Sequence, residues 1–258
     1  MDLAESEVHV WSLPLDLPLP RQDQAAAALS PAERERAARF ALPQARRRFI
    51  AGRGQLRELL GRYLERDPAT LEFESGPHGK PALAGAAAAS GLQFNLAHSD
   101  NLALLAVTRS GPVGVDLERI RPLPDIPRLV ARFFSPRENA AFQALRAQEQ
   151  TAAFFNLWTR KEAWLKATGE GIGQLLAQVE VSFVPGEPVR LLSLPDGVRA
   201  VAGWRLEHLE PAPGFVGALV ADASAGCVRC FSIHPSRHSG PAPAFPPGWD
   251  GGPLPRCA

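Results

Sequence analysis

Two carboxylates at alternate positions of a predicted strand are the first sign of chemistry in the sequence. Asp116 and Glu118 stand in the segment GVDLE, within an apolar run that predicts a strand over 113–117. Because alternate residues of a strand share a face, the two carboxylates project together. Such a pair is typical of a Mg²⁺ site, since Mg²⁺ takes hard oxygen ligands. The alternative is a solvated strand end whose carboxylates pair with Arg119 and Arg121.

A third carboxylate stands in an amphipathic segment, WTRKEAWLK. Glu162 lies at the edge of the apolar stripe of a helix predicted over 149–168, and Lys166 follows one turn later. At such an edge a carboxylate can reach a partly desolvated site, where a cation would keep it ionised. The alternative is an i,i+4 surface pair between Glu162 and Lys166, which contributes only about 0.2–0.5 kcal/mol.

A turn lysine and a strand-end histidine form the third candidate group. In the segment PHGKP, a glycine and two prolines predict a tight turn that presents Lys80. In the segment FNLAHS, His98 ends a predicted strand. An ammonium and an imidazole at these places would suit phosphate oxygens or a nucleotide. The alternative is an ordinary turn lysine and a buried core histidine.

Capped helices alternate with strands in both halves of the chain. The segments SPAE and SPRE, at 30–33 and 135–138, are capping boxes with a serine N-cap, a proline at N1 and a glutamate at N3. A proline-rich link without a helix leads from the first strand to the first box. Helices are predicted from 31, over 43–64, over 125–132, from 136 and over 149–168. Strands are predicted over 8–13, 71–74, 92–96, 102–108, 113–117, 179–183, 204–209, 215–221 and 228–233.

This order of elements predicts an α+β fold of two similar, pseudo-duplicated lobes. We place the first lobe at 1–110 and the second at 111–234. The remaining segment, 235–258, holds seven prolines and four glycines and is predicted to be a disordered tail. Cys227 and Cys230 are interpreted as strand thiols rather than as metal ligands.

Composition excludes several classes of protein. With 45% hydrophobic and 21% charged residues, the 258-residue chain has an ordinary globular composition. Its net charge of +1 gives no bulk attraction to nucleic acid or to an anionic membrane. No apolar run reaches the ~18–20 residues of a membrane span. Acidic residues near the N-terminus are unlike a signal peptide, so we expect a cytoplasmic protein.

Lysine is rare and its placement is selective. Of 28 basic side chains only Lys80, Lys161 and Lys166 are lysines, and all three fall in the segments quoted above. An ammonium and a guanidinium differ in size, hydration and geometry. The pattern therefore predicts that these positions require a compact ammonium.

Taken together and in this order, the segments resemble the 4′-phosphopantetheinyl transferase superfamily, in its two-lobed, Sfp-like branch. The resemblance covers about residues 8–233 and depends on GKP, FNLAHS, GVDLE and WTRKEAWLK, with the helix opening SPAERERAARF as further support. Each motif alone is weak, but four in succession are specific. The resemblance implies two similar lobes with the active site in the cleft between them.

Enzymes of this kind move phosphopantetheine from coenzyme A to a serine of an apo acyl, peptidyl or aryl carrier protein and release adenosine 3′,5′-bisphosphate. The resemblance implies Mg²⁺ held by Asp116, Glu118 and Glu162 in the second lobe, with Asp116, Glu162 and Lys166 as catalytic residues. We expect Glu162 to accept the serine proton, directly or through a metal-bound water, and Lys166 to stabilise or protonate the leaving group. The first lobe would bind the adenylate end of coenzyme A through Arg36, His78, Gly79, Lys80, Asn95, Ala97 and His98. We expect a monomer.

Two departures and two alternatives accompany this resemblance. Glu33 stands where some relatives carry a basic phosphate contact, and Ala97 replaces a serine that often precedes the histidine. One alternative is a relative that binds a nucleotide or carrier without catalysis. The other is a Mg²⁺-dependent phosphohydrolase. The sequence does not indicate which carrier protein is served.

Overall fold

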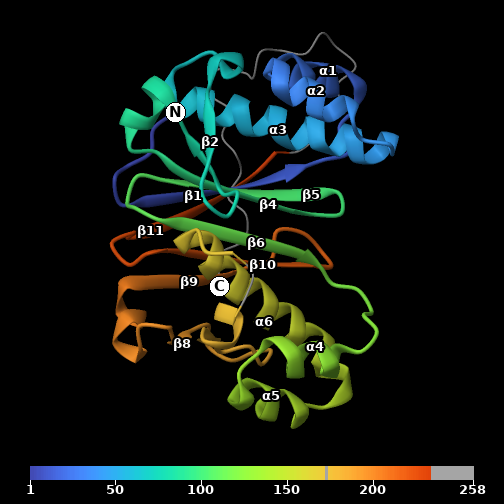
Figure 1. The fold of residues 1–258 in the computed structure, drawn as a ribbon, viewed down its shortest axis with the longest axis vertical. Helices are drawn as coiled ribbons and strands as arrows, with labels where there is room; N and C mark the ends of the chain where they lie inside the picture. Colours follow the sequence, from blue (N-terminus) through green and yellow to red (C-terminus); the bar gives the residue numbers. More distant parts are fainter. Residues whose placement is uncertain (172–173, 234–258) are drawn as a thin grey trace.

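Two β-sheets lie face to face between two groups of helices in the computed structural model, which describes residues 1–171 and 174–233 (Figure 1). Each group of helices covers the outer face of one sheet. The predicted α+β class with two similar lobes is confirmed. The predicted tail over 235–258 lies outside the described residues.

The first lobe is a four-stranded sheet under three helices. Its strands are β1 (Glu7–Pro14), β4 (Gln93–Ser99), β5 (Leu102–Thr108) and β11 (Cys227–Ser232), and its helices are α1 (Leu19–Ala27), α2 (Pro31–Ala38) and α3 (Pro43–Leu64). The strand order is β11-β1-β5-β4, with β11 parallel to β1 and the other pairs antiparallel. β11 comes from the predicted second lobe, so the two lobes share this sheet.

The second lobe is a three-stranded antiparallel sheet covered by one long helix. Its strands are β6 (Val113–Arg119), β9 (Trp204–Leu209) and β10 (Phe215–Asp222), and its helices are α4 (Ile126–Phe133), α5 (Pro136–Gln143) and α6 (Ala147–Thr168). The strand order is β6-β10-β9. α6 ends at Gly169 in a left-handed conformation (φ 76°), as predicted.

The two sheets meet through an apolar layer and two side-chain bridges. The apolar residues between them include Val10, Leu104, Val115 and Leu219, all buried. The Asn95 side chain in β4 accepts a hydrogen bond from a β6 backbone N–H at 2.9 Å, and the Ser99 hydroxyl accepts another at 3.0 Å. These bonds fix β4 against β6, and the FNLAHS segment thereby lies beside GVDLE.

Most predicted elements are confirmed, and the short ones show where local patterns are insufficient. Both capping boxes form as predicted. The shorter elements are η1 (Pro68–Thr70), β2 (Phe73–Ser75), β3 (Pro81–Leu83), η2 (Gly85–Ser90), η3 (Gln174–Ala177), β7 (Glu180–Val181), β8 (Leu191–Ser193) and η4 (Val198–Gly203). β3 and β8 were not predicted, because strands of three residues are too short to show a period.

The proline-rich link was predicted without a helix, and this prediction is wrong. α1 forms there although its N-terminus has no side-chain cap. A Cβ on Gly54 in α3 would overlap the backbone of Ala25, so the two helices are in backbone contact. Packing against α3 therefore stabilises a helix that its own sequence signals only weakly. Within the described ranges, none of the helices combines the length and apolar character that crossing a bilayer requires.

Candidate active site

β6 and α6 pack backbone to backbone at Gly114 of the GVDLE segment. A Cβ on this residue would overlap the carbonyl oxygen of Ala163 and the backbone nitrogen of Ala167. Glycine therefore brings the strand within reach of the side chains of the helix. Asp116, two residues further along β6, accepts a hydrogen bond from Lys166 Nζ at 2.5 Å. The contact between β6 and α6 thus joins the GVDLE and WTRKEAWLK segments, both of which the sequence predicts to carry site residues.

Asp116 and Glu162 are buried carboxylates, only 6% and 4% exposed. Among the described residues, neither Asp116 Oδ2 nor Glu162 Oε1 has a hydrogen-bond partner. Burial raises the pKa of Asp116 to about 6 although Lys166 opposes the shift, and burial with the neighbouring Asp116 charge raises the pKa of Glu162 to about 7. The alternative of a solvated Glu162–Lys166 pair is wrong, because Glu162 is buried and Lys166 bonds to β6.

Glu118 completes the acidic face of β6. It is half-buried, and its Oε2 accepts a hydrogen bond from Ser99 Oγ at 3.0 Å. Arg119, one of the cations expected to neutralise a solvated strand end, pairs with Asp100 instead. The negative charge of Glu118 further raises the pKa of both buried carboxyl groups. The strand end is therefore an acidic site rather than a set of surface ion pairs.

The chemistry of these oxygen atoms fits a magnesium ion in part. Buried carboxylate oxygens without hydrogen-bond partners are suitable ligands for a hard divalent cation, and binding the cation would satisfy them. Within the described ranges, however, no three or more His, Cys, Asp or Glu side chains are grouped closely enough to hold a metal by themselves. Mg²⁺ commonly takes one or two carboxylates and completes its shell with substrate phosphates and water. The two unpaired oxygens match that pattern.

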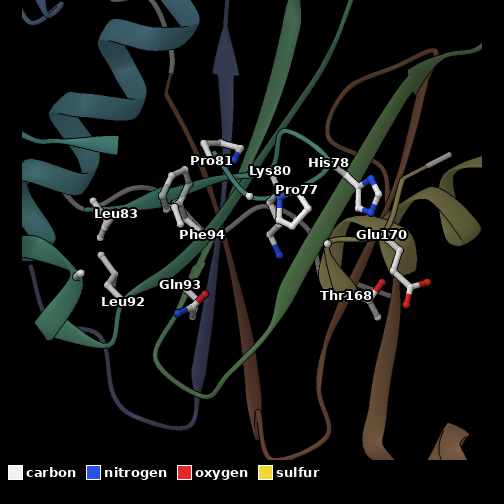
Figure 2. A pocket seen from close by; sticks show the side chains of 14 residues that line it. Pro77, His78, Lys80, Pro81, Leu83, Leu92, Gln93, Phe94, Thr168 and Glu170 are labelled. Atoms are coloured by element: carbon white, nitrogen blue, oxygen red, sulfur yellow. The ribbon is translucent and has the colours of Figure 1, made fainter. Parts of the chain in front are cut away.

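A cavity of about 430 Å³ lies between the PHGKP turn, β4 and the end of α6 (Figure 2). Its walls include Pro77, His78, Lys80, Phe94, Thr168 and Glu170. Lys80 Nζ donates hydrogen bonds to two second-lobe carbonyl oxygens at 3.0 Å each. Burial lowers the pKa of Lys80 to about 8. The structure therefore brings the predicted turn lysine and His78 together at one cavity between the lobes.

The other residues predicted to bind coenzyme A lie at different depths. His98 is exposed, so the alternative of a buried core histidine is wrong. Asn95 and Ala97 are buried between the sheets, and the Asn95 side chain is engaged with β6. Arg36 is exposed on α2, with its guanidinium 5.3 Å from the ring centroid of Phe49. Their contact with a ligand stays a prediction.

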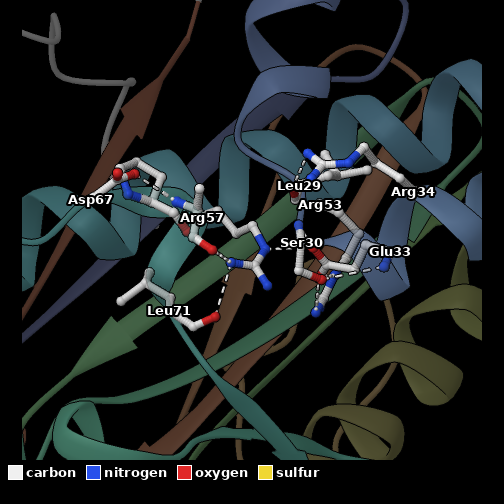
Figure 3. A network of polar contacts seen from close by, with 10 residues as sticks. Leu29, Ser30, Glu33, Arg34, Arg53, Arg57, Asp67 and Leu71 are labelled. Atoms are coloured by element: carbon white, nitrogen blue, oxygen red, sulfur yellow. Dashed lines mark hydrogen bonds and ion pairs between the residues drawn. The ribbon is translucent and has the colours of Figure 1, made fainter.

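Glu33 holds α2, the helix that carries Arg36, in place (Figure 3). It completes the capping box with Ser30, and its carboxylate accepts hydrogen bonds from Arg57 Nε at 2.5 Å and Arg53 Nε at 2.8 Å. The acid that replaces a basic residue of some relatives is thus part of the scaffold. Whatever phosphate contact α2 supplies must come from its other side chains.

The partners of Lys161 and two of the cavity residues carry too little sequence signal to be predicted. Lys161 is fully buried, and its Nζ donates to Glu138 Oε2 at 2.5 Å and to the Leu176 carbonyl at 2.7 Å. The second capping box could have indicated Glu138 as a buried acid, but not its partner. The cavity residues Thr168 and Glu170 have no distinguishing pattern, because they enter the wall only through the way α6 ends.

Comparison with known proteins identifies the family of the chain. A sequence model of the 4′-phosphopantetheinyl transferase superfamily matches residues 112–219, and a model of the N-terminal part of 4′-phosphopantetheinyl transferases matches residues 18–110. Together they cover parts of both lobes and all four segments quoted above. The chain therefore belongs to the 4′-phosphopantetheinyl transferase superfamily.

Three known proteins illustrate the degree of similarity. The chain is 44% identical to the 4′-phosphopantetheinyl transferase HetI of Nostoc, over 85% of this chain and 89% of the relative. It is 28% identical to the 4′-phosphopantetheinyl transferase Sfp of Bacillus subtilis, over 73% of this chain and 82% of the relative. A crystal structure of a holo-(acyl-carrier-protein) synthase from Bacillus anthracis is 20% identical and covers 42% of this chain and 92% of its own, with a TM-score of 0.35.

Proposed function

We propose that this transferase moves the phosphopantetheine group of coenzyme A to a serine hydroxyl of an apo carrier protein and releases adenosine 3′,5′-bisphosphate. The observation that carries the proposal is the pair of buried carboxylates, Asp116 and Glu162, beside Lys166, each with an oxygen that has no hydrogen-bond partner in the part of the chain that the structure describes. Such a cluster is expensive to bury unless a cation and a substrate complete it. Membership of the superfamily supplies the reaction that this cluster serves.

Asp116 and Glu162, with Glu118 nearby, are the residues that would hold Mg²⁺. When bound, the ion would supply positive charge to the pyrophosphate oxygens of coenzyme A. The residues themselves support this assignment, because burial and mutual repulsion raise the pKa of both buried carboxyl groups. Positive charge beside them would favour their ionised forms.

Glu162 is the group we assign as the acceptor of the serine proton. Its Oε1 has no hydrogen-bond partner among the described residues, and without a cation burial raises its pKa to about 7, so the carboxylate is available to accept a proton. Lys166 is held beside Asp116, and its ammonium would stabilise the negative charge that develops on the leaving phosphate. Phosphoryl transfer needs positioning and charge neutralisation more than covalent catalysis, and these residues supply both.

The first-lobe residues would bind the adenylate end of coenzyme A. His78 and Lys80 line the cavity between the lobes, while Arg36 and His98 are exposed on the same lobe. Gly79 shapes the turn, and Asn95 and Ala97 would present backbone groups. The division into 1–110 for nucleotide binding and 111–234 for catalysis is kept as part of the proposal, with β11 shared between them.

A cytoplasmic monomer is proposed as well, and the exposed free thiol of Cys227 is suited to a reducing compartment.

One incubation tests the proposed function against its alternatives. The protein is mixed with coenzyme A, Mg²⁺ and an apo carrier protein, and the carrier is analysed by mass spectrometry. A mass gain of one phosphopantetheinyl group together with bisphosphate release supports transfer. Bisphosphate release without a change in the carrier indicates a phosphohydrolase. Coenzyme A binding with neither product indicates a non-catalytic relative.

A panel of apo carriers identifies the physiological partner. Acyl, peptidyl and aryl carrier proteins are compared by kcat/KM under the same conditions. Because kcat/KM measures the free energy of the transition state relative to the free reactants, it ranks the carriers directly. A carrier class that is modified at a much higher kcat/KM than the others is the partner class.

A further inference from the structure

Lys80 connects the first lobe to both elements that carry the acidic site. Its Nζ donates one hydrogen bond to the carbonyl oxygen of Val113 and another to that of Ala167, each at 3.0 Å. Val113 is the first residue of β6, and Ala167 lies in the last turn of α6. One ammonium therefore bridges the strand of Asp116 and the helix of Lys166.

The backbone that presents Lys80 is held by its own turn. Gly79 has a φ of 81°, a conformation that favours glycine, and its N–H donates to the Gly76 carbonyl at 2.9 Å. The Gly76 N–H donates in turn to the Lys80 carbonyl at 2.9 Å, and Pro81 begins β3 directly afterwards. The lysine stem thus starts from a fixed point in the first lobe.

The acceptor carbonyls explain why a cation is placed here. The last four carbonyls of a helix have no donor within the helix, and the C-terminal end carries a partial negative charge. The Ala167 carbonyl is one of them, and Lys80 supplies its donor from the other lobe. The stem passes Gly169, where Lys80 Cδ would be 3.9 Å from an added Cβ. The ammonium caps α6 at the end that faces the cavity (Figure 2).

We propose that Lys80 is a positioning residue, which holds α6 against β6 in the register that joins Lys166 to Asp116. Ala167 directly follows Lys166, and Val113 stands three residues before Asp116, so both acceptors flank the ion pair. This inference rests on the proposed function, because the contact that Lys80 holds in place, Lys166 with Asp116, matters for the proposed transfer reaction. It replaces, for Lys80, the adenylate contact proposed for the first-lobe residues, because the Lys80 Nζ is already engaged by the two carbonyl oxygens.

The burial of Lys80 supports a lysine rather than an arginine at this position. The side chain is half-buried and its pKa is lowered to about 8, so the ammonium is kept in a partly desolvated place. A compact ammonium can direct its N–H groups at two carbonyls that converge on one point. A planar guanidinium is larger and presents its donors in a fixed fork. Lys80→Arg should therefore keep the charge and lose the bridge.

The test separates catalysis from nucleotide binding. For Lys80→Met and Lys80→Arg, kcat and the KM for coenzyme A are measured with an apo carrier, and the Kd of adenosine 3′,5′-bisphosphate is measured by calorimetry. We expect kcat to fall about tenfold to a hundredfold, as for the loss of charge-assisted hydrogen bonds, while the bisphosphate Kd changes by less than about twofold. The matched control is Glu74→Ala, an exposed residue of the same hairpin, which should leave both quantities unchanged.

Hydrogen exchange supplies a readout that does not depend on turnover. Loss of the bridge should accelerate exchange of the amides of 165–170, because the last turn of α6 then opens more readily. If Lys80→Met does not fold, Lys80→Arg carries the test.

Two results overturn the proposal. A bisphosphate Kd that rises tenfold or more with kcat unchanged makes Lys80 a ligand contact only. Unchanged kcat, Kd and exchange show that the bridge has no role. If the unmodified protein itself transfers nothing to any carrier, the proposed function fails instead, and the exchange measurement still decides whether Lys80 holds α6.

Discussion

The two lobes repeat one polar arrangement around their capping boxes. In the first lobe, Glu33 of SPAE accepts a hydrogen bond from Arg57 Nε of α3 at 2.5 Å. In the second, Glu138 of SPRE accepts one from Lys161 Nζ of α6, also at 2.5 Å. Each glutamate also closes its own capping box. We call these two groups the capping-box ion pairs, Ser30–Glu33–Arg57 and Ser135–Glu138–Lys161.

Both capping-box ion pairs extend to the short helix that follows. Arg57 Nη1 donates to the Pro68 carbonyl in η1 at 2.8 Å, and Lys161 Nζ donates to the Leu176 carbonyl in η3 at 2.7 Å. In each lobe a buried cation thus ties together a capped helix, a long helix and a 3₁₀ turn. This shared contact set is stronger support for a duplicated unit than the weak sequence similarity of the halves.

The lobes differ in the surroundings of the glutamate that directly follows the buried cation of each long helix. Glu58 follows Arg57, just as Glu162 follows Lys161, and in both helices a cation stands four residues later. Glu58 lies 3.5 Å from Arg21, and cations around it oppose the rise of its pKa by burial. Glu162 instead lies near a second carboxylate and has an unpaired oxygen within the described residues. The first-lobe glutamate thus has an arginine partner, whereas the second-lobe lysine, which also opposes the rise of the Glu162 pKa, is bonded to Asp116 instead.

The largest expected effect distinguishes these two glutamates. Glu162→Gln should lower kcat for carrier modification by about a thousandfold or more, because the variant loses the proton acceptor and a cation ligand. Glu58→Gln, the matched change in the first lobe, should keep kcat within about threefold, since that glutamate is only structural. Both rates are measured by the mass gain of the carrier under saturating Mg²⁺. Near-normal turnover by Glu162→Gln would remove Glu162 from the reaction.

The sequence could predict features that depend on neighbouring residues, but not those that depend on contacts between residues far apart in the chain. The strand alternation of Asp116 and the capping boxes are local patterns, so the acidic face and the helix starts could be predicted. The Asp116–Lys166 bond joins residues 50 positions apart and depends on Gly114, whose importance appears only when β6 lies on α6. The partner of Lys161 and the helix α1 likewise depend on tertiary contacts, which a linear pattern does not contain.

The rarity of lysine gains a physical explanation from these contacts. Lys80 donates to two carbonyls, Lys161 to Glu138 and a carbonyl, and Lys166 to Asp116. The ammonium groups of Lys80 and Lys161 each donate to two acceptors and that of Lys166 to one carboxylate oxygen, all in wholly or partly buried places that suit a compact point charge. The corresponding first-lobe cation, Arg57, also stacks on Phe73, and its guanidinium spreads over several acceptors. Acceptor geometry therefore accounts for the lysines that the chain retains.

The capping-box ion pairs should differ in their tolerance of a lost cation. Lys161→Met leaves Glu138 buried without the one cation that pairs with it among the described residues, which should cost about 3–5 kcal/mol of unfolding free energy. Arg53→Met removes one of two cations from Glu33, and Arg57 remains, so the cost should be about 1 kcal/mol. Urea denaturation of both variants checks the contrast. Equal losses of unfolding free energy in the two variants would show that Arg57 does not compensate for the loss of Arg53 at Glu33.

Glycine contacts in the two lobes should affect stability alike but activity differently. Gly114→Ala and Gly54→Ala each force a Cβ into a neighbouring backbone, which should cost about 1–3 kcal/mol. Only Gly114→Ala should also lower kcat per folded molecule, because it moves β6 away from α6. Gly203→Ala, which has open space around its Cβ, is the control. Thermal unfolding and carrier modification are measured for each. An unchanged kcat in Gly114→Ala would separate the β6–α6 junction from catalysis.

The smallest effect is a pH dependence that Mg²⁺ should remove. The pKa of Glu162 is raised from 4.5 to about 7, so the folded protein holds more protons than the unfolded chain between these values. Stability without metal should therefore fall by roughly 1–2 kcal/mol as the pH rises from about 4.5 to about 7, and the raised pKa of Asp116 acts in the same direction. Mg²⁺ should restore the loss at the upper end of this window, because it binds the ionised carboxylates of the folded state.

The measurement is urea denaturation across this pH range, with chelator or with Mg²⁺. Glu58→Gln should keep the Mg²⁺ response, and Glu162→Gln should lose most of it. An equal response in both variants would place the cation away from Glu162 and leave the two glutamates equivalent.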